Sequence, residues 1–258
     1  MDINQQSEIL QLLDSERQMI TYPDVTRFSD GGVIRDVSAD GKSCEIVYSP
    51  CSESEVDRVI ARQIEAARGA EYALEWKVYG HDQPRCLGER LQAAGFEAGE
   101  REEFMVFFVD HASLDGFGVS DGDIRRVTDR EGLRDYRIIR EEVSGRDCTR
   151  EVARHAFQLE YHPESMSVYV AYVDGEPAAT GRVYFHADSQ FAGLYGGSTR
   201  ERFRKRGLFT QVVAVRIREA VARGIVTTCV DALPTSEPIL RKRGFESVTY
   251  TQPFTFSG

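Results

Sequence analysis

The sequence predicts an α/β protein (α+β in some schemes) that consists of two similar halves. Strand-like apolar runs alternate along the chain with amphipathic helical patterns, and this order of elements is typical of the class. Short segments also recur about 150 residues apart: AARG at 66–69 matches VARG at 221–224, and LQAAGFE at 91–97 matches LRKRGFE at 240–246. Both stretches run strand, helix, strand, helix, Gly-Phe-Glu and strand, so we interpret them as a diverged repeat.

Length and charge exclude several classes of protein. The chain has 258 residues, 41% of them hydrophobic, and a net charge of −10. A chain of this length can form a large hydrophobic core. The negative charge argues against a general binder of nucleic acids or anionic membranes, because such proteins are more often basic. Five cysteines without a CxxC pattern argue against a disulfide framework and favour a reducing cytoplasm. The polar first twenty residues do not resemble a signal peptide, and the sequence has no run of 18 apolar residues.

A glycine-rich stretch, SLDGFGVSDGD at 113–123, divides the chain. It predicts a first domain at 1–115, a linker at 116–121 and a second domain at 122–258. GVSDG at 118–122 matches the GxSxG nucleophile pattern, but no apolar strand precedes it and no long helix follows it. We therefore read it as part of the linker.

The first half contains the signals of three strands and two helices. Ser52 and Glu55 form a capping-box pattern before the apolar periodicity that runs from Val56 to Ala67, and Gly69 ends that helix. A second helix precedes Gly95. The expected strands are at 44–48, 72–79 and 104–109, and the second helix is at 86–94.

The second half has clearer patterns. Asp174-Gly175 lies between two β-rich runs, which is a strong hairpin signal. Leu208 to Ala222 has the spacing of a helix that ends before Gly224, and a short helix capped by Thr235 or Ser236 stops at Gly244. The other expected elements are strands at 124–127, 168–173, 176–185, 191–198, 225–230 and 248–256, and helices at 129–140 and 151–159.

The stretch GLYGGSTRERFRKRGLFTQVV indicates a site for a polyanion. A strand leads into a basic turn, which opens a helix whose first N–H groups lack intrahelical partners. A pyrophosphate fits such a helix start, and Gly207 removes the Cβ that would block its approach. Arg204, Lys205 and Arg206 add positive charge, and Arg200 and Arg202 extend the patch. The alternative is a solvated basic turn without a ligand.

These residues resemble the Gcn5-related N-acetyltransferase (GNAT) family and its R/Q-x-x-G-x-G/A motif. Residues 204–208 match the first five positions, whereas Phe209 replaces the usual small last residue. The hairpin VYVAYVDGEPAATGRVYF and the segment PTSEPILRKRGFE are similar to further family elements, with Leu240 where a Tyr is common. The resemblance covers 122–258, and WKVYGHDQP in the first half resembles the tandem bacterial members.

The resemblance implies two domains with a mixed central sheet flanked by helices, and acetyl-CoA as co-substrate. The pantetheine arm would lie in a V-shaped gap between two strands, along Gly197, Ser198 and Thr199. The pyrophosphate would lie on the turn that consists of Arg204, Lys205, Arg206, Gly207, Leu208, Phe209 and Thr210. A strand N–H would polarise the thioester carbonyl.

The first half is expected to have lost cofactor binding. Its corresponding turn, CSESEVD, carries Glu53, Glu55 and Asp57 where basic residues are needed. Carboxylates repel a pyrophosphate, although they complement the start of a helix. We expect the first half to support the second, so that the isolated C-terminal half is poorly soluble or weakly active.

Catalytic residues are harder to select from the sequence. An acceptor amine is mostly protonated at neutral pH and must lose a proton. Tyr195, beside the presumed thioester, is the first choice for lining the site, and Ser236 is considered as a partner of the leaving thiolate because Leu240 has no hydroxyl. Further candidates for the acid or base are Glu160, His162, His186, Asp188 and Asp231.

The predicted function is transfer of the acetyl group of acetyl-CoA to a primary amine in the cytoplasm. The acceptor would be a small molecule or a peptide, and we expect no nucleic-acid or membrane partner and no metal, while the oligomeric state stays open. The alternative is a noncatalytic acyl-CoA sensor with the same fold. Neither HExxH nor a P-loop motif occurs, and His155 and His162 suggest no third metal ligand.

Overall fold

The computed structural model describes residues 1–109, 117 and 122–256, so most of the predicted linker lies outside it. The described residues form two compact units, which do not follow the chain as two consecutive stretches. The first unit contains 1–104, 231–234 and the C-terminal strand from 247, and the second contains 105–230 and 235–246. The last strand of the chain therefore completes the first unit.

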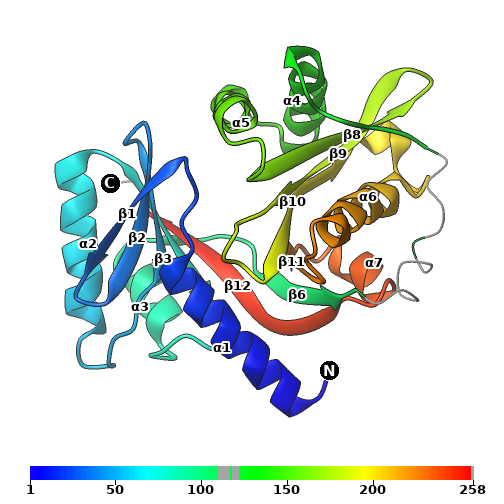
Figure 1. Ribbon diagram of the computed structural model, residues 1–258. Helices are drawn as coiled ribbons and strands as arrows, with labels where there is room; N and C mark the ends of the chain where they lie inside the picture. The colour runs from blue at the N-terminus through cyan, green and yellow to red at the C-terminus, as the bar shows by residue number, and fades with distance from the viewer. Residues whose placement is uncertain (110–116, 118–121, 257–258) are drawn as a thin grey trace. The chain divides into compact units, whose positions relative to one another are not determined.

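The first unit has a mixed sheet in the order β1-β2-β3-β4-β12 (Figure 1). β3 and β4 are parallel, whereas β1–β2, β2–β3 and β4–β12 are antiparallel. Its elements are α1 (Ile3–Met19), β1 (Val25–Asp30), β2 (Val33–Ser38), β3 (Ser43–Tyr48), α2 (Val56–Ala70), β4 (Ala73–Tyr79), α3 (Leu87–Ala93), β5 (Glu97–Ala98) and β12 (Glu246–Phe256), with β6 (Glu102–Phe108) at its boundary.

The core of the first unit surrounds Trp76. This side chain is fully buried, and its indole N–H donates to Ser49 Oγ at 3.0 Å. The apolar face of α2, with Val56 and Ile60, packs into the same cluster, as do Phe254 and Phe256 from β12. The C-terminal strand therefore contributes two aromatic side chains to the N-terminal core.

The second unit has a mixed sheet in the order β11-β10-β9-β8-β7. β10 and β11 are parallel and the other neighbours are antiparallel. In Figure 1, α4 and α5 cover one face of this sheet and α6 the other. The elements are β7 (Asp123–Arg126), α4 (Arg130–Ser144), α5 (Thr149–Tyr161), β8 (Met166–Val173), β9 (Glu176–Tyr184), β10 (Phe191–Thr199), η2 (Glu201–Phe203), α6 (Leu208–Ala222), β11 (Thr227–Ala232) and α7 (Glu237–Arg241).

The two sheets have the same topology, as the repeat in the sequence predicts. In each, three antiparallel strands are followed by a helix, a parallel strand and a short helix: β1-β2-β3-α2-β4-α3 in one and β8-β9-β10-α6-β11-α7 in the other. Each parallel pair is joined by a helix of 15 residues, the crossover that such a pair requires. The predicted fold class is confirmed.

α1 and the β1–β2 hairpin were not predicted from the sequence. α1 is mostly polar, and it is fixed by Asp2, whose carboxylate accepts from the N–H groups of Asn4 and Gln5 at 2.9 Å, and by the buried Arg17. Arg17 donates to Val47 O and forms an ion pair with Asp82 at 2.8 Å. No helix in the described part of the chain is long and apolar enough to cross a membrane.

Candidate active site

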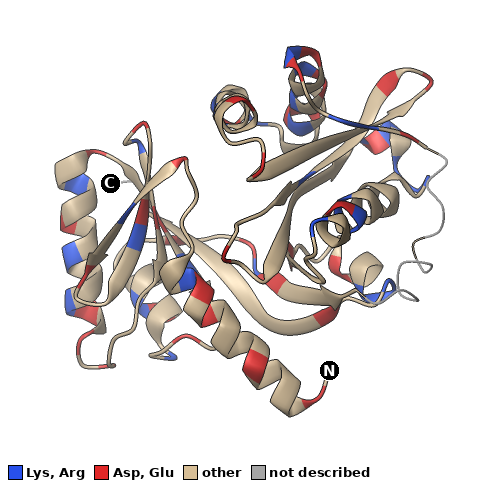
Figure 2. Cartoon of the chain, viewed as in Figure 1, with Lys and Arg blue, Asp and Glu red and all other residues tan. Residues whose placement is uncertain are grey.

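The turn between β10 and α6 has an unusual backbone. A single turn of 3-10 helix, η2, follows β10, and the chain then passes through Lys205 and Gly207 at φ values of +63° and +77° before α6 begins at Leu208. A Cβ on Gly207 would meet only Gln211 Nε2, at 4.0 Å, so the space beside this glycine is open. Lys and Arg residues are frequent in this segment (Figure 2).

The turn presents a set of unpaired backbone donors. Arg204 N–H donates to Glu201 O and Gln211 N–H donates to Gly207 O. Between them, none of the six N–H groups from Lys205 to Thr210 donates to another described residue. Such a row of donors at the start of a 15-residue helix is a binding site for an anion.

Only part of the basic patch predicted from the sequence carries uncompensated charge. Arg200 forms an ion pair with Glu142 at 2.6 Å, and Arg202 forms one with Glu176. Lys205 and Arg206 are exposed and form no ion pair with a described residue. The positive charge at the turn therefore comes from Lys205, Arg206 and Arg204.

Phe209, the aromatic residue that departs from the family motif, lies next to a glycine of β10. A Cβ on Gly197 would lie 2.9 Å from the ring of Phe209. The glycine on β10 therefore leaves the room that the larger side chain on α6 needs.

β10 and β11 stay paired over a short length. Their parallel register runs from Phe191–Thr227 to Gly193–Cys229, while β10 continues to Thr199. Against β9, the register of β10 shifts between Tyr195 and Ser198, where Gly196 has a φ of +62°. We call residues 195–198 the β10 bulge.

The predicted site residues on β10 differ in burial and in the contacts of their side chains. Ser198 is buried, and its hydroxyl accepts from Arg140 Nη1 at 2.9 Å. Thr199 Oγ1 is buried without a hydrogen-bond partner. Tyr195 is half-buried, and its ring contacts the ring of Tyr184 edge-on at 5.8 Å. Gly197 is exposed.

Ser236 and Leu240 lie at the two ends of the short helix α7. The hydroxyl of Ser236 does not cap this helix, although its carbonyl accepts from the N–H groups of Ile239 and Leu240. The side chain of Leu240 is buried, so it serves the core and provides no proton. The role of Ser236 toward a thiolate stays a prediction.

The other acid and base candidates are distributed over several elements. Glu160 and Asp188 are exposed. His162 ends α5, and Nδ1 of His186 accepts from Asp188 N–H at 3.1 Å. Burial, together with the charge of Arg182, lowers the pKa of His155 to about 2, so this buried imidazole stays neutral.

Asp231 belongs to a charged cluster of the first unit. Its carboxylate accepts from Lys77 Nζ at 2.6 Å and from Thr251 Oγ1 at 3.0 Å. Burial and then the negative charge of Asp231 raise the pKa of Glu102 to about 7, while burial raises that of Glu75. Asp231 is thus fixed by an ion pair, and Glu102 is the carboxyl of this cluster that titrates near neutral pH.

Glu102→Gln should stabilise the first unit at pH 8 but not at pH 4.5. The folded pKa of about 7 lies above the ordinary value, so the wild type loses stability as the pH rises from about 4.3 to 7. We expect a gain of about 1–2 kcal/mol at pH 8, reduced from the full shift because the carboxyl is only half-buried. Urea unfolding at both pH values measures it, with Glu103→Gln as the control for charge. An equal gain for both variants would contradict the prediction.

Comparison with known proteins finds a family match that includes this turn. Residues 133–245 match the model of the acetyltransferase (GNAT) family. The matched segment includes β10, the basic turn and α6. Over these residues the chain is similar to the GNAT family.

The fold of this chain is similar to that of solved structures over most or all of its length. A GCN5-related N-acetyltransferase from Kribbella flavida has a TM-score of 0.70 at 17% identity, and the match covers 100% of this chain and 97% of that one. A tandem GNAT protein from the clavulanic acid biosynthesis pathway has a TM-score of 0.59 at 14% identity, with 99% and 95% covered. A functionally unknown conserved protein from Staphylococcus epidermidis has a TM-score of 0.69 at 16% identity, with 92% and 97% covered. A search of curated proteins found no match.

The first GNAT-like half has a different turn between β3 and α2. Ser52 N–H and Ser52 Oγ both donate to Glu55 Oε2, at 3.3 and 2.6 Å, and Arg58 forms an ion pair with Glu55 at 3.2 Å. The predicted capping box forms only in part, because the Ser52 hydroxyl bonds to the carboxylate and α2 begins at Val56. Carboxylates occupy this turn, as the sequence indicates.

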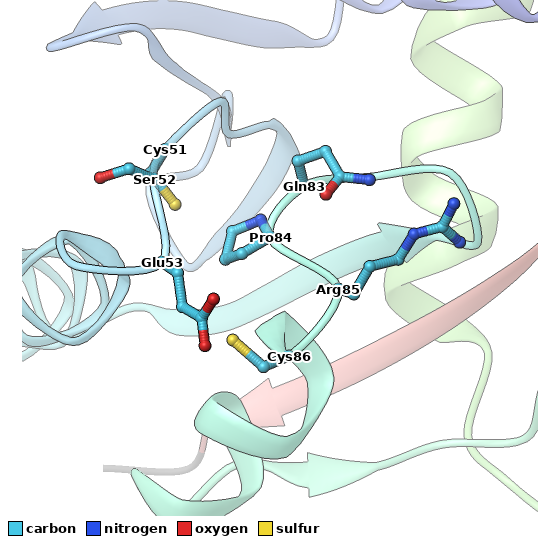
Figure 3. A pocket seen from close by; sticks show the side chains of 7 residues that line it. All are labelled: Cys51, Ser52, Glu53, Gln83, Pro84, Arg85 and Cys86. Atoms are coloured by element: carbon cyan, nitrogen blue, oxygen red, sulfur yellow. The ribbon is translucent and has the colours of Figure 1, made fainter.

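A cavity of about 360 Å³ lies beside that turn. Figure 3 shows the two segments that line it, Cys51–Ser52–Glu53 and Gln83–Pro84–Arg85–Cys86. Glu53 therefore faces the cavity that adjoins the start of α2. All five cysteines are free thiols, as the sequence predicts.

One group in the first unit has the composition of a metal site. Ligand atoms of Asp14, His81 and Asp82 lie within 4.8 Å of one another. The guanidinium of Arg17 already forms ion pairs with both carboxylates at 2.8 Å. This arginine supplies the positive charge that a metal ion would bring.

Arg216, a buried arginine next to the β10 bulge, was not identified from the sequence. Arg216 is only 2% exposed and lies among Val212, Val213 and Ile217 on the buried face of α6. A charged residue within an apolar helical stripe is the signal that could have identified it.

Proposed function

We propose that the protein is a cytoplasmic N-acetyltransferase that moves the acetyl group of acetyl-CoA directly to a primary amine. The observation that carries this proposal is the turn before α6. It combines six unpaired N–H groups, the open side of Gly207 and the uncompensated charge of Lys205 and Arg206. These features suit the pyrophosphate of a coenzyme A thioester.

Each part of the cofactor has a proposed place. The N–H groups of Arg206 to Thr210 would hold the pyrophosphate, with Arg204 and Lys205 adding charge. The pantetheine arm would follow the backbone of Gly197, Ser198 and Thr199, where β10 has left β11. Acetyl-CoA supplies an activated acyl group, and a β10 N–H would polarise its carbonyl.

The acceptor must lose a proton before it attacks. We propose a small-molecule or peptide amine, because an acidic chain with a net charge of −10 attracts cations. Tyr195 is the proposed residue at the reacting carbonyl, since it begins the β10 bulge and is half-buried. Ser236 is the proposed partner of the thiolate.

A noncatalytic acyl-CoA-binding module is the second candidate. The observation that favours it is Leu240, which is buried and has no hydroxyl where relatives commonly have a tyrosine. Both candidates bind acetyl-CoA, so binding does not separate them. Release of CoA thiol in the presence of a panel of amines does, because only an enzyme accelerates it.

Acetyl-CoA should bind with a stoichiometry of one per chain and raise the melting temperature. A ligand that binds only the folded state stabilises it by about 2.7 kcal/mol at 100 times Kd. One site is expected because Glu53 and Glu55 replace the basic residues in the first half. Calorimetric titration and thermal unfolding measure the two quantities.

Two results would contradict this proposal. A melting temperature that is unchanged at millimolar acetyl-CoA would remove the cofactor assignment. A stoichiometry of two would show that the acidic turn of the first half also binds the cofactor.

A further inference from the structure

Arg216 is a buried cation without a carboxylate partner. It is 2% exposed, and its guanidinium forms no ion pair within the described part of the chain. Burial, and then the nearby charge of Arg182, lowers its pKa to about 9, so it remains protonated at neutral pH. A buried unpaired charge is unfavourable for folding, so stability alone does not account for this residue.

The guanidinium of Arg216 lies at the β10 bulge. Nε donates to Val212 O at 3.0 Å within α6, while Nη1 donates to Arg182 O at 2.8 Å and to Tyr195 O at 3.3 Å. Arg182 and Tyr195 are the last register pair of β9 and β10 before the bulge. One donor group therefore holds the two strands at the point where their ladder is interrupted.

Glycines on both strands make room for guanidinium groups. A Cβ on Gly181 would lie 2.7 Å from Arg216 Cζ, and a Cβ on Gly196 would lie 3.0 Å from Arg182 Cζ. Arg182 reaches toward α4 and α5, where it forms an ion pair with Glu151 at 2.7 Å, whereas Arg216 comes from α6. The β10 bulge thus lies between two guanidinium groups on opposite faces of the sheet.

On the face of the sheet that α5 covers, Glu151 is the carboxylate that forms ion pairs with Arg182 and Arg140. Burial would raise its pKa, but the charge of Arg182 and the hydrogen bonds from Tyr136 and Arg140 lower it to about 2. Arg140 also donates to Ser198 Oγ at 2.9 Å, so a third guanidinium contacts the β10 bulge. Three cations and one carboxylate surround these few residues.

We infer that Arg216 is a positioning residue, which sets the conformation of the β10 bulge by holding the carbonyl oxygens of Arg182 and Tyr195. This inference rests on the proposed function, because the β10 bulge is where the acetyl-bearing arm of acetyl-CoA is proposed to lie. A guanidinium presents donors in a fixed plane, so it fixes two carbonyl groups in a way that an apolar side chain does not. The hydrogen bonds of the Arg216 guanidinium go to Val212, Arg182 and Tyr195, none of which belongs to the turn before α6.

The test compares two ligands on the full chain. Adenosine 3′,5′-bisphosphate probes the turn before α6, and acetyl-CoA probes the turn and the β10 bulge together. For Arg216→Met we expect Kd for acetyl-CoA to rise at least about tenfold, the loss of charge-assisted hydrogen bonds. We expect Kd for the bisphosphate to change less than about twofold.

Controls separate position from charge. Arg134→Met removes an exposed cation of α4, with a side chain that is 67% exposed, and should leave both affinities unchanged. Gly181→Ala keeps the charge but displaces the guanidinium, and should reproduce the selective loss for acetyl-CoA even where Arg216→Met does not fold. Arg216→Lys should show a smaller loss than Arg216→Met, since the ammonium keeps the charge and N–H donors but lacks the planar guanidinium.

Four outcomes are possible, and each decides for or against the inference. Unchanged acetyl-CoA affinity in both Arg216→Met and Gly181→Ala overturns the inference, and so does an equal loss for the two ligands. A wild-type chain that binds neither ligand overturns the proposed function itself, and with it this inference. A selective loss for acetyl-CoA in both variants supports it.

Discussion

Gly207→Glu should abolish acetyl-CoA binding in a protein that still folds. The backbone here has a φ of +77°, which costs a residue with a side chain about 1–2 kcal/mol. The new carboxylate would lie beside the unpaired N–H groups from Lys205 to Thr210 and repel the pyrophosphate. We expect Kd to rise roughly 100-fold, or about 3 kcal/mol.

Gly224→Glu is the matched control for this variant. Gly224 follows the other end of α6, with a φ of +83° and open space around a Cβ. The same charge and a similar backbone strain are thus introduced away from the turn. Calorimetric titration of both variants with acetyl-CoA should show binding in Gly224→Glu alone. Equal affinities would place the cofactor elsewhere.

Phe254→Ala should strongly destabilise the N-terminal core, although only four residues follow Phe254 in the sequence. Phe254 is 3% exposed, pairs in register with Trp76 and belongs to the same core cluster. Truncation of a buried phenylalanine costs about 3–5 kcal/mol. The fluorescence of Trp76, the single tryptophan of the chain, reports on this core during denaturation.

Thr255→Ala is the control on the same strand. Its side chain is exposed, and such a change alters the free energy of unfolding by less than about 0.5 kcal/mol. If Phe254→Ala left the tryptophan transition unchanged, β12 would not belong to the first unit. The pairing of β12 with β4 also gives a reason for the low solubility expected of an isolated C-terminal half, which would carry an unpaired β12.

Local sequence patterns were sufficient to predict the elements that form the proposed cofactor site. The hairpin at Asp174-Gly175, the helix from Leu208 to Ala222 and the turn around Gly207 depend on turn residues and on periodicity, which a single sequence displays. The repeat was visible because both halves keep the same order of elements. The polar helix α1 was not predicted, since its buried residue Arg17 is held by Asp82 and Val47, far away in the sequence, as well as by the nearby Asp14.

The sequence by itself determined the fold class, the two related halves and the basic turn that opens α6, because each depends on residues that are neighbours along the chain. Only the tertiary structure decided which cations are neutralised: Arg200 and Arg202 meet Glu142 and Glu176, whereas Lys205 and Arg206 meet no acid among the described residues. It also decided that β12 pairs with β4 and that Arg216 reaches the β10 bulge. Ion pairs, strand partners and buried polar contacts join residues tens to hundreds of positions apart, and local propensity carries no information about such pairs.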